Sequence, residues 1–326
     1  MSATDAAIHA SGLAKNYGGK VQALAGFDLT VPRGIVFGLL GPNGSGKTTA
    51  VKCLTTLARY DRGTARVAGF DVAAEPEQVR ARIGLTGQYA AVDELLSGRE
   101  NLVMFGKLVG FRSRYAKSFA DELLERFGLA EAADRPVGHY SGGMRRRIDL
   151  AVSILPAPEV LVLDEPTTGL DPQSRNQMWS AVRELVRGGT TVLLTTQYLD
   201  EADQLASRIA VLKGGRVIAE GTADELKHQA GGDQITLVVR DAEDIPLAAD
   251  VVDSVGGTYP QIEQEERRIS APAADRIATL TNVLRALESR GVRVEDIAIR
   301  RPTLDEAFLS LTENRTRSSD SEVLSS

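Results

Sequence analysis

The sequence predicts a wound α/β domain followed by a smaller α+β domain. Three short apolar runs are typical of strands that helices bury on both faces: Ile35 to Leu40, Val160 to Leu163 and Thr191 to Leu194. The first run leads through a glycine-rich segment into a predicted helix over residues 46–58. A chain of 326 residues has room for one domain of about 200 to 250 residues and a second, smaller one.

Two changes of pattern divide the chain further. From about residue 90 to 150, apolar side chains recur at three- and four-residue steps, which indicates a helical insertion in the core. At residues 227–232 the sequence KHQAGG interrupts the core pattern. Beyond it, a predicted helix over residues 274–290 lies among three short runs typical of strands: 235–239, 267–269 and 292–299.

These patterns predict three parts. Residues 1–228 form the core domain, and residues 229–312 form a small accessory domain. The tail, residues 313–326, is polar and rich in serine, so it has too little apolar surface to order itself.

Charge and composition exclude several classes of protein. The formal net charge of -6 argues against a protein that wraps nucleic acid, because that task needs a basic face. The only cysteine, Cys53, cannot form an internal disulfide and suits a reducing compartment. The apolar runs are shorter than the 18 or so residues of a spanning helix, and the amino terminus lacks the pattern of a secretory signal. We therefore expect a cytoplasmic chain that does not cross the membrane.

The most specific motif is the sequence GPNGSGKT at residues 41–48, which follows a strand and opens a helix, as the P-loop pattern requires. Its glycines let backbone N–H groups surround a phosphate, Lys47 adds a positive charge, and the Thr48 hydroxyl can ligate Mg²⁺. The motif predicts binding of ATP with Mg²⁺. The candidate binding residues are Gly41, Pro42, Asn43, Gly44, Ser45, Gly46, Lys47, Thr48 and Thr49.

Two adjacent carboxylates end the second apolar run. Asp164 and Glu165 follow Leu163 at the edge of the predicted sheet where ligands bind in open α/β folds. We expect Asp164 to hold Mg²⁺ through water, because this ion keeps part of its hydration shell. Glu165 is the candidate general base or water-orienting residue. Lys47 and Gln197 are the other two catalytic candidates.

A second glycine pair identifies the type of P-loop protein. The sequence YSGGMR at residues 140–145 places Ser141, Gly142 and Gly143 at a helix start, where exposed N–H groups and a hydroxyl can bind an anion. It resembles the ABC signature motif, usually written LSGGQ. The resemblance implies that two copies pair head to tail, so that the signature of one contacts ATP held by the P-loop of the other.

Further elements of the ABC pattern follow in the expected order over roughly residues 7–225. Tyr17 matches the aromatic residue that stacks on adenine, Gln88 matches the Q-loop glutamine that contacts Mg²⁺ and the reacting water, and Asp171 matches the D-loop. The resemblance implies an ABC ATPase core with an antiparallel β subdomain and a helical subdomain at about residues 90–150. The three arginines at residues 145–147 are interpreted as a basic face of the signature helix rather than as a nucleic-acid site.

One position departs from the family pattern. After the strand Thr191 to Leu194, ABC ATPases usually carry a histidine that contacts the γ-phosphate, whereas this sequence has Gln197. A glutamine amide can donate a neutral hydrogen bond, but it does not titrate near neutral pH as histidine does.

The sequence resembles in particular the daunorubicin/doxorubicin-resistance type of ABC ATPase. The matching segments are TGQYA at residues 86–90, YSGGMRRR at 140–147, LTTQYLDEA at 194–202 and RPTLDEAF at 301–308. The resemblance implies a peripheral subunit on the cytoplasmic side of the membrane that powers a separate permease exporting a hydrophobic drug or lipid-like compound. A soluble nucleotide-dependent regulator, a non-catalytic sensor and an importer subunit remain as alternatives.

Overall fold

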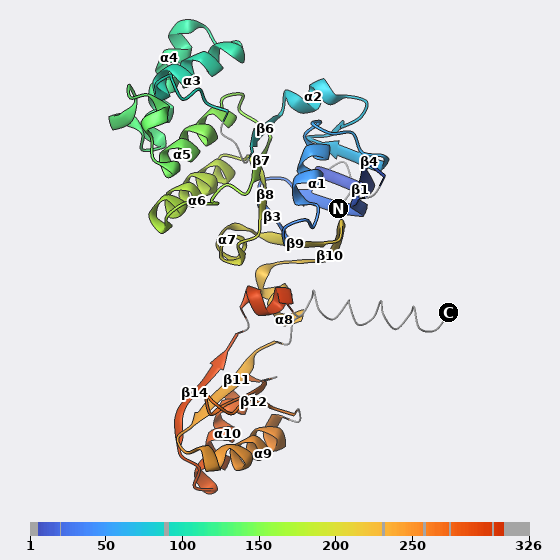
Figure 1. Ribbon diagram of the computed structural model, residues 1–326, viewed down its shortest axis with the longest axis vertical. Coiled ribbons are helices and arrows are strands. Elements are labelled where there is room, and N and C mark those ends of the chain that lie inside the picture. Colours follow the sequence, from blue (N-terminus) through green and yellow to red (C-terminus); the bar gives the residue numbers. More distant parts are fainter. Residues whose placement is uncertain are drawn as a thin grey trace. The chain divides into compact units, whose positions relative to one another are not determined.

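The computed structural model describes residues 6–19, 21–87, 91–229, 232–256, 259–273, 275–301 and 303–309. The chain divides into two compact units, Met1–Thr222 and Ala223–Ser326, both drawn in Figure 1. The division lies before helix α8 (Ala223–Gln229), whereas the sequence pattern placed it after residue 228. The predicted tail, residues 313–326, lies outside the described residues.

The N-terminal unit is built on a largely parallel sheet, as predicted. In its described part, six strands take the order β10-β9-β3-β8-β7-β6. Neighbouring strands from β9 to β6 run parallel, and only β10 pairs antiparallel, with β9. The strands are β3 (Val36–Leu40), β6 (Ile83–Thr86), β7 (Val160–Asp164), β8 (Thr191–Thr196), β9 (Arg208–Lys213) and β10 (Arg216–Gly221).

Each face of this sheet packs in a separate hydrophobic core, which explains why its strands are apolar throughout. In β7, Val160 and Val162 belong to one core, while Leu161 and Leu163 belong to the other. Such two-sided burial requires helices or a second sheet on both faces. Figure 1 shows four helices on one side of the sheet: α3 (Gly98–Leu108), α4 (Ser113–Arg126), α5 (Gly142–Ser153) and α6 (Pro172–Arg187). On the other side it shows α1 (Lys47–Leu54) and a second sheet that contains β1 (Ala6–Tyr17) and β4 (Arg62–Val67).

An antiparallel sheet covers one face, as the resemblance implies. Its order is β2-β1-β4-β5, and the buried Phe27 of β2 shares a core with Phe37 of β3. The helix predicted over residues 46–58 is shorter, α1 (Lys47–Leu54), because Thr56 takes a left-handed conformation with φ 65° that ends it. The strands are β1 (Ala6–Tyr17), β2 (Val21–Pro32), β4 (Arg62–Val67) and β5 (Phe70–Asp71).

Helices cover the opposite face and include the predicted helical insertion. Ser97 and Glu100 form a reciprocal capping box at the start of α3, which fixes where the insertion begins. The helices and short 3-10 turns of the N-terminal unit, beyond α1, are α2 (Pro76–Arg80), α3 (Gly98–Leu108), α4 (Ser113–Arg126), η1 (Ala130–Ala132), η2 (Val137–His139), α5 (Gly142–Ser153), α6 (Pro172–Arg187) and α7 (Leu199–Leu205).

The C-terminal unit is an α+β domain with its own core, as predicted. Its sheet order is β12-β13-β11-β14, and β11 alternates half-buried and buried residues. The helix α9 was not predicted from the sequence, and Pro246 lies in its first turn, where proline fits a helix. The elements are β11 (Gln234–Val239), η3 (Ala242–Asp244), α9 (Ile245–Gly256), β12 (Gln261–Glu263), β13 (Arg268–Pro272), α10 (Arg276–Ser289) and β14 (Val294–Arg300), and residues 304–309 are also helical.

The separate cores predict separate stabilities. Leu237 is fully buried in the C-terminal core, so Leu237→Ala should destabilise that unit by about 2–5 kcal/mol through lost burial and a cavity. Calorimetry of the full chain should show a lower melting temperature for the C-terminal unit. The melting temperature of the N-terminal unit, recognised as the one that ATP raises, should not change. A uniform shift of all heat absorption would contradict independent cores.

Candidate active site

The loop between β3 and α1 is shaped by a glycine that no other residue could replace without movement. Gly46 has φ 113°, and a Cβ at this position would lie 2.5 Å from the carbonyl oxygen of Ala23. The chain can therefore turn directly into α1 at Lys47, so the N–H groups of the first helical turn remain unpaired by the helix. Such a helix start favours an anion.

This loop lines a pocket of about 420 Å³ that gathers six of the nine predicted P-loop residues, Tyr17 at the end of β1 and Glu165. Asp164 and the remaining P-loop residues, Gly41, Pro42 and Ser45, are not among the lining residues. Tyr17, at the end of β1, is 43% exposed, so its ring is available to a ligand. The pocket is lined by Tyr17, Val21, Gln22, Ala23, Asn43, Gly44, Gly46, Lys47, Thr48, Thr49 and Glu165.

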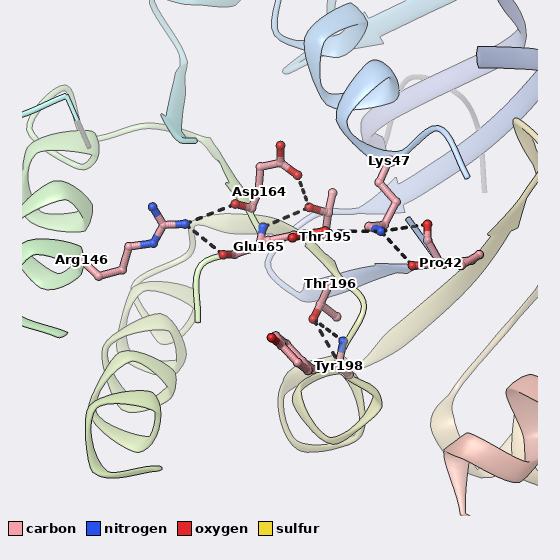
Figure 2. Close-up of polar contacts among 9 residues, drawn as sticks. Pro42, Lys47, Arg146, Asp164, Glu165, Thr195, Thr196 and Tyr198 are labelled. Carbon is pink, nitrogen blue, oxygen red and sulfur yellow. Dashed lines mark hydrogen bonds and ion pairs between the residues drawn. The ribbon is translucent and has the colours of Figure 1, made fainter. Parts of the chain in front are cut away.

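Lys47 crosses the pocket floor toward the carboxylate turn. Its ammonium donates to the carbonyls of Gly41 at 2.8 Å and Pro42 at 3.2 Å. The same nitrogen lies 3.4 Å from Oε1 of Glu165, and the two side chains are only 4% and 12% exposed. Figure 2 shows this convergence. The candidate phosphate-binding cation and the candidate base are therefore in direct contact as a largely buried ion pair.

The two adjacent carboxylates have different surroundings. Asp164 closes β7 and is buried, and its Oδ1 accepts from the Thr195 hydroxyl of β8 at 2.5 Å. Glu165 leaves the strand with φ 52°, a left-handed conformation that is uncommon for glutamate. Its N–H donates to the Thr195 carbonyl at 3.0 Å. The turn therefore holds Asp164 in the sheet and directs the Glu165 side chain into the pocket. Backbone strain like that at Glu165 is often found at functional sites.

The oxygen atoms at this site fit Mg²⁺ better than a transition metal. Thr48 offers a hydroxyl, Asp164 offers a carboxylate, and the buried Ser45 hydroxyl has no hydrogen-bond partner among the described residues. Within those residues there is no group of three or more His, Cys, Asp or Glu side chains arranged for a metal. An ion held by few protein oxygens, with water and phosphate completing its shell, matches Mg²⁺ chemistry. Gln88, the third metal candidate, lies outside the described residues.

The predicted signature motif lies at a different place from the P-loop pocket. Ser141 caps α5 and accepts from the Met144 N–H at 3.3 Å, and both Ser141 and Gly142 are exposed. A Cβ on Gly143 would lie 2.2 Å from Oγ of Ser174 on α6, so close helix packing requires glycine there. None of Ser141, Gly142 or Gly143 is among the residues that line the P-loop pocket.

Asp171 caps the helix that packs against the signature. Its carboxylate accepts from the Ser174 N–H at 3.2 Å. The hydrogen bond with the Ser174 side chain, followed by that with its backbone, holds the pKa of Asp171 below the usual range. The predicted D-loop aspartate therefore orders the exposed start of α6 (Pro172–Arg187) beside Gly143.

Gln197 lies just beyond β8, in a turn closed by hydroxyl bonding. The Thr196 Oγ1 accepts from the Tyr198 N–H at 2.9 Å, which leaves Gln197 half-buried between them. The side chain is not among those lining the P-loop pocket. The structure therefore places Gln197 at the carboxyl edge of the same sheet as Asp164 without bringing it to the pocket wall.

Two charged residues that support this edge were missed by sequence reasoning. Glu201 on α7 is fully buried and accepts from Nε1 of Trp179 at 3.2 Å. Burial raises its pKa above the usual glutamate range. Arg146 is half-buried and donates to backbone carbonyls, so the interpretation of residues 145–147 as a simple basic face is wrong for this residue. Arg146 lies between two further arginines and Glu201 follows Asp200, so no local sequence pattern marks either residue.

Comparison with known proteins agrees with this geometry. A family model described as ABC transporter matches residues 24–168, and one described as ATP-binding protein DrrA1-3-like, C-terminal domain, matches residues 221–312. The daunorubicin resistance ATP-binding protein DrrA2 of Streptomyces coeruleorubidus is 59% identical over 96% of this chain and 97% of its own length. The daunorubicin/doxorubicin resistance ATP-binding protein DrrA of Streptomyces peucetius is 51% identical over 94% of this chain and 92% of its own.

Solved structures give the same result for the core. A structure described as the ATP binding subunit of an ABC transporter is 27% identical, with a TM-score of 0.62, and covers 69% of this chain and 93% of that one. Fold and site thus define an ATP-binding subunit of the ABC transporter class. The chain belongs to the family of daunorubicin/doxorubicin resistance ATP-binding proteins, which confirms the resemblance seen in the sequence.

No helix in the described ranges is long and apolar enough to cross a membrane.

The buried carboxyl of Glu201 predicts a pH-dependent stability. Because its pKa in the folded chain is raised, its stabilising contribution is complete below the unfolded value of about 4.3 and is lost as pH rises through the folded pKa. Glu201→Gln keeps an acceptor for Trp179 and cannot ionise. Its melting temperature relative to wild type should therefore increase between pH 5 and pH 8, by about 2–4 °C for each kcal/mol.

The matched control is Glu122→Gln on α4, where the carboxylate is exposed. Its melting temperature should follow wild type at every pH. A constant offset between Glu201→Gln and wild type across the range would mean that the buried carboxyl does not titrate there.

Proposed function

We propose that this chain binds and hydrolyses ATP and thereby powers a separate membrane permease that exports a hydrophobic compound, such as an antibiotic or a lipid-like molecule. The observation that carries the proposal is the ion pair of Lys47 and Glu165 in the lining of the P-loop pocket, with Nζ and Oε1 3.4 Å apart. A phosphate-binding cation beside a water-orienting carboxylate is the arrangement that phosphoryl transfer to water needs. The names of the relatives, resistance proteins for daunorubicin and doxorubicin, support export.

The candidate site residues have separate proposed parts in hydrolysis. Tyr17 stacks on the base, while Lys47 and the N–H groups at the start of α1 bind the phosphates. Glu165 orients the attacking water and accepts its proton. Mg²⁺, when bound, neutralises charge on the phosphates. Thr48 and Asp164 would hold it, together with Gln88, which lies outside the described residues.

The separation of the two phosphate-binding ends supports a dimer. Since Ser141, Gly142 and Gly143 do not line the P-loop pocket of their own chain, we propose that they contact ATP held by a second copy, head to tail. Asp171 would then lie at the same interface. Closure of such a dimer on ATP is a ligand-driven movement that can be passed to a permease at the cytoplasmic face of the membrane.

Other functions make different demands on the site. A non-catalytic sensor would need ATP binding without hydrolysis, which the presence of a candidate base, Glu165, in the P-loop pocket does not favour. An importer subunit would use the same residues, because the permease sets the direction of transport. A soluble regulator acting on ribosomes or DNA would be expected to offer a basic face, which the net charge of -6 does not favour.

The proposed role of the Glu165 carboxylate can be tested with a conservative substitution. Glu165→Gln keeps the shape of the side chain but removes the proton acceptor, so ATPase activity should fall by about 100-fold or more, while ATP binding is retained. The measurement is Mg²⁺-dependent phosphate release by wild type and variant, alone and with the permease in liposomes. Stimulation of wild type by the permease supports transport, whereas no hydrolysis with any permease would favour the sensor.

The second prediction concerns Gln197. Because glutamine does not titrate, the pH profile of ATPase activity should lack a step near about 6.5, the usual histidine pKa, and turnover should be slow. Gln197→His should introduce such a step. A clear inflection near this pH in the wild-type profile would contradict the assignment of residue 197 as the γ-phosphate contact.

A further inference from the structure

One arginine on the signature helix joins three separate segments of the catalytic core. Arg146 donates through Nε to the Pro166 carbonyl at 2.8 Å and through Nη2 to the Glu165 carbonyl at 3.0 Å and the Asp164 carbonyl at 3.3 Å. Its Nη1 donates to the Gly87 carbonyl at 2.6 Å. Figure 2 shows the guanidinium reaching the turn from the side opposite Lys47.

Asp149, one helical turn beyond Arg146, holds the other side of the same region. Its Oδ1 accepts from the Ala91 N–H at 2.8 Å, and the carboxylate is 4% exposed. Burial raises the pKa of Asp149, and the neighbouring Arg146 opposes that rise. The two side chains therefore tie α5 to Gly87 and to Ala91, the described residues on either side of residues 88–90.

The contacts of Arg146 differ from those of its neighbours in the sequence. Arg145 donates to the carboxylate of Glu94 at 3.1 Å and to the Gly138 carbonyl at 2.7 Å, both in the helical insertion. Arg147 donates to carbonyls at the end of α4. Of the three arginines, Arg146 alone is recorded, among the described residues, as bonding the turn that carries Asp164 and Glu165.

Three of the four carbonyls that Arg146 binds, those of Asp164, Glu165 and Pro166, belong to the strained turn. Glu165 has φ 52°, and a buried carbonyl that loses its donor costs about 1–3 kcal/mol. Removing the guanidinium would let this turn relax toward conformations that satisfy its carbonyls in another way. The direction of the Glu165 side chain would then change, and a displacement of about 1 Å can cost a catalytic group as much as 100-fold in rate.

We infer that Arg146 is a positioning residue: with Asp149 it fixes the Glu165 turn, Gly87 and Ala91 to the signature helix, so that the catalytic carboxylate and the signature motif move as one body. The inference deepens the proposed hydrolysis function and rests on it. Neither residue contacts the P-loop pocket, so both act on the reaction only through the residues that they hold.

The first test compares two substitutions of Arg146 with a matched change of Arg145. Arg146→Lys keeps a charge but cannot bond four carbonyls, and Arg146→Met removes the charge. Both should lower kcat by about 10- to 100-fold, with the Kd for a fluorescent ATP analogue changed by less than about threefold. Arg145→Met should keep kcat near the wild-type value, even where its melting temperature falls as far as that of Arg146→Lys.

The second test measures how well the Glu165 turn is ordered, without relying on ATP hydrolysis. Amide hydrogen exchange of the full chain should become faster in peptides carrying Glu165 and Ala91 for Arg146→Lys and Asp149→Ala, and should be unchanged there for Arg145→Met. If Arg146→Met does not fold, Arg146→Lys and Asp149→Ala still decide the matter. Exchange and kcat in Arg146→Lys that equal those of Arg145→Met would overturn the inference.

The two tests separate this inference from the proposed function. Wild type that binds the ATP analogue but never hydrolyses ATP, with or without the permease, would overturn the proposed hydrolysis. Faster exchange around Glu165 and Ala91 in the Arg146 variants would still support the positioning role in that case.

Discussion

The turn at Asp164 and Glu165 is the constraint on which the rest of the site depends. It is held from one side by Thr195 of β8, which bonds the Asp164 carboxylate and accepts the Glu165 N–H, and from the other by Arg146 of α5. Such a turn could not persist at a buried strand end without these bonds, because its carbonyls would be left unpaired. The position of Glu165 beside Lys47 thus depends on β8 and α5 as well as on its own strand, β7.

The parallel sheet makes this arrangement possible. Since β3 and β7 both pair with β8 in parallel, the P-loop after β3 and the carboxylates after β7 emerge at the same edge. The alternation of Val160 and Val162 with Leu161 and Leu163 between two cores fixes the register of β7, and a slip of one residue would turn Asp164 to the other face. Core packing therefore sets the direction of the Asp164 carboxylate, the proposed ligand of Mg²⁺.

The sequence predicted the parts of this site that are local in the chain. The P-loop, the Asp164–Glu165 pair and the signature are runs of adjacent residues whose spacing carries the chemistry, and the buried strands are marked by apolar runs. The roles of Arg146 and Glu201 could not be derived in this way. Arg146 is one of three consecutive arginines, and only the packing of α5 against β7 and residues 83–87 decides which of them points inward.

Arg146 supports the turn that carries Asp164 and Glu165, but it leaves the carboxylates of these two residues to other partners. Each hydrogen bond recorded for Arg146 in the described structure ends on a backbone carbonyl. An arginine paired in fork geometry with Glu165 or Asp164 would bind the oxygens needed for water or Mg²⁺. By bonding the main chain instead, Arg146 fixes the direction of both side chains while Thr195 and Lys47 make the contacts to the carboxylates themselves. Rigidity and reactivity at this turn thus come from different atoms of the same residues, which allows the signature helix to support the catalytic carboxylate without neutralising it by direct pairing.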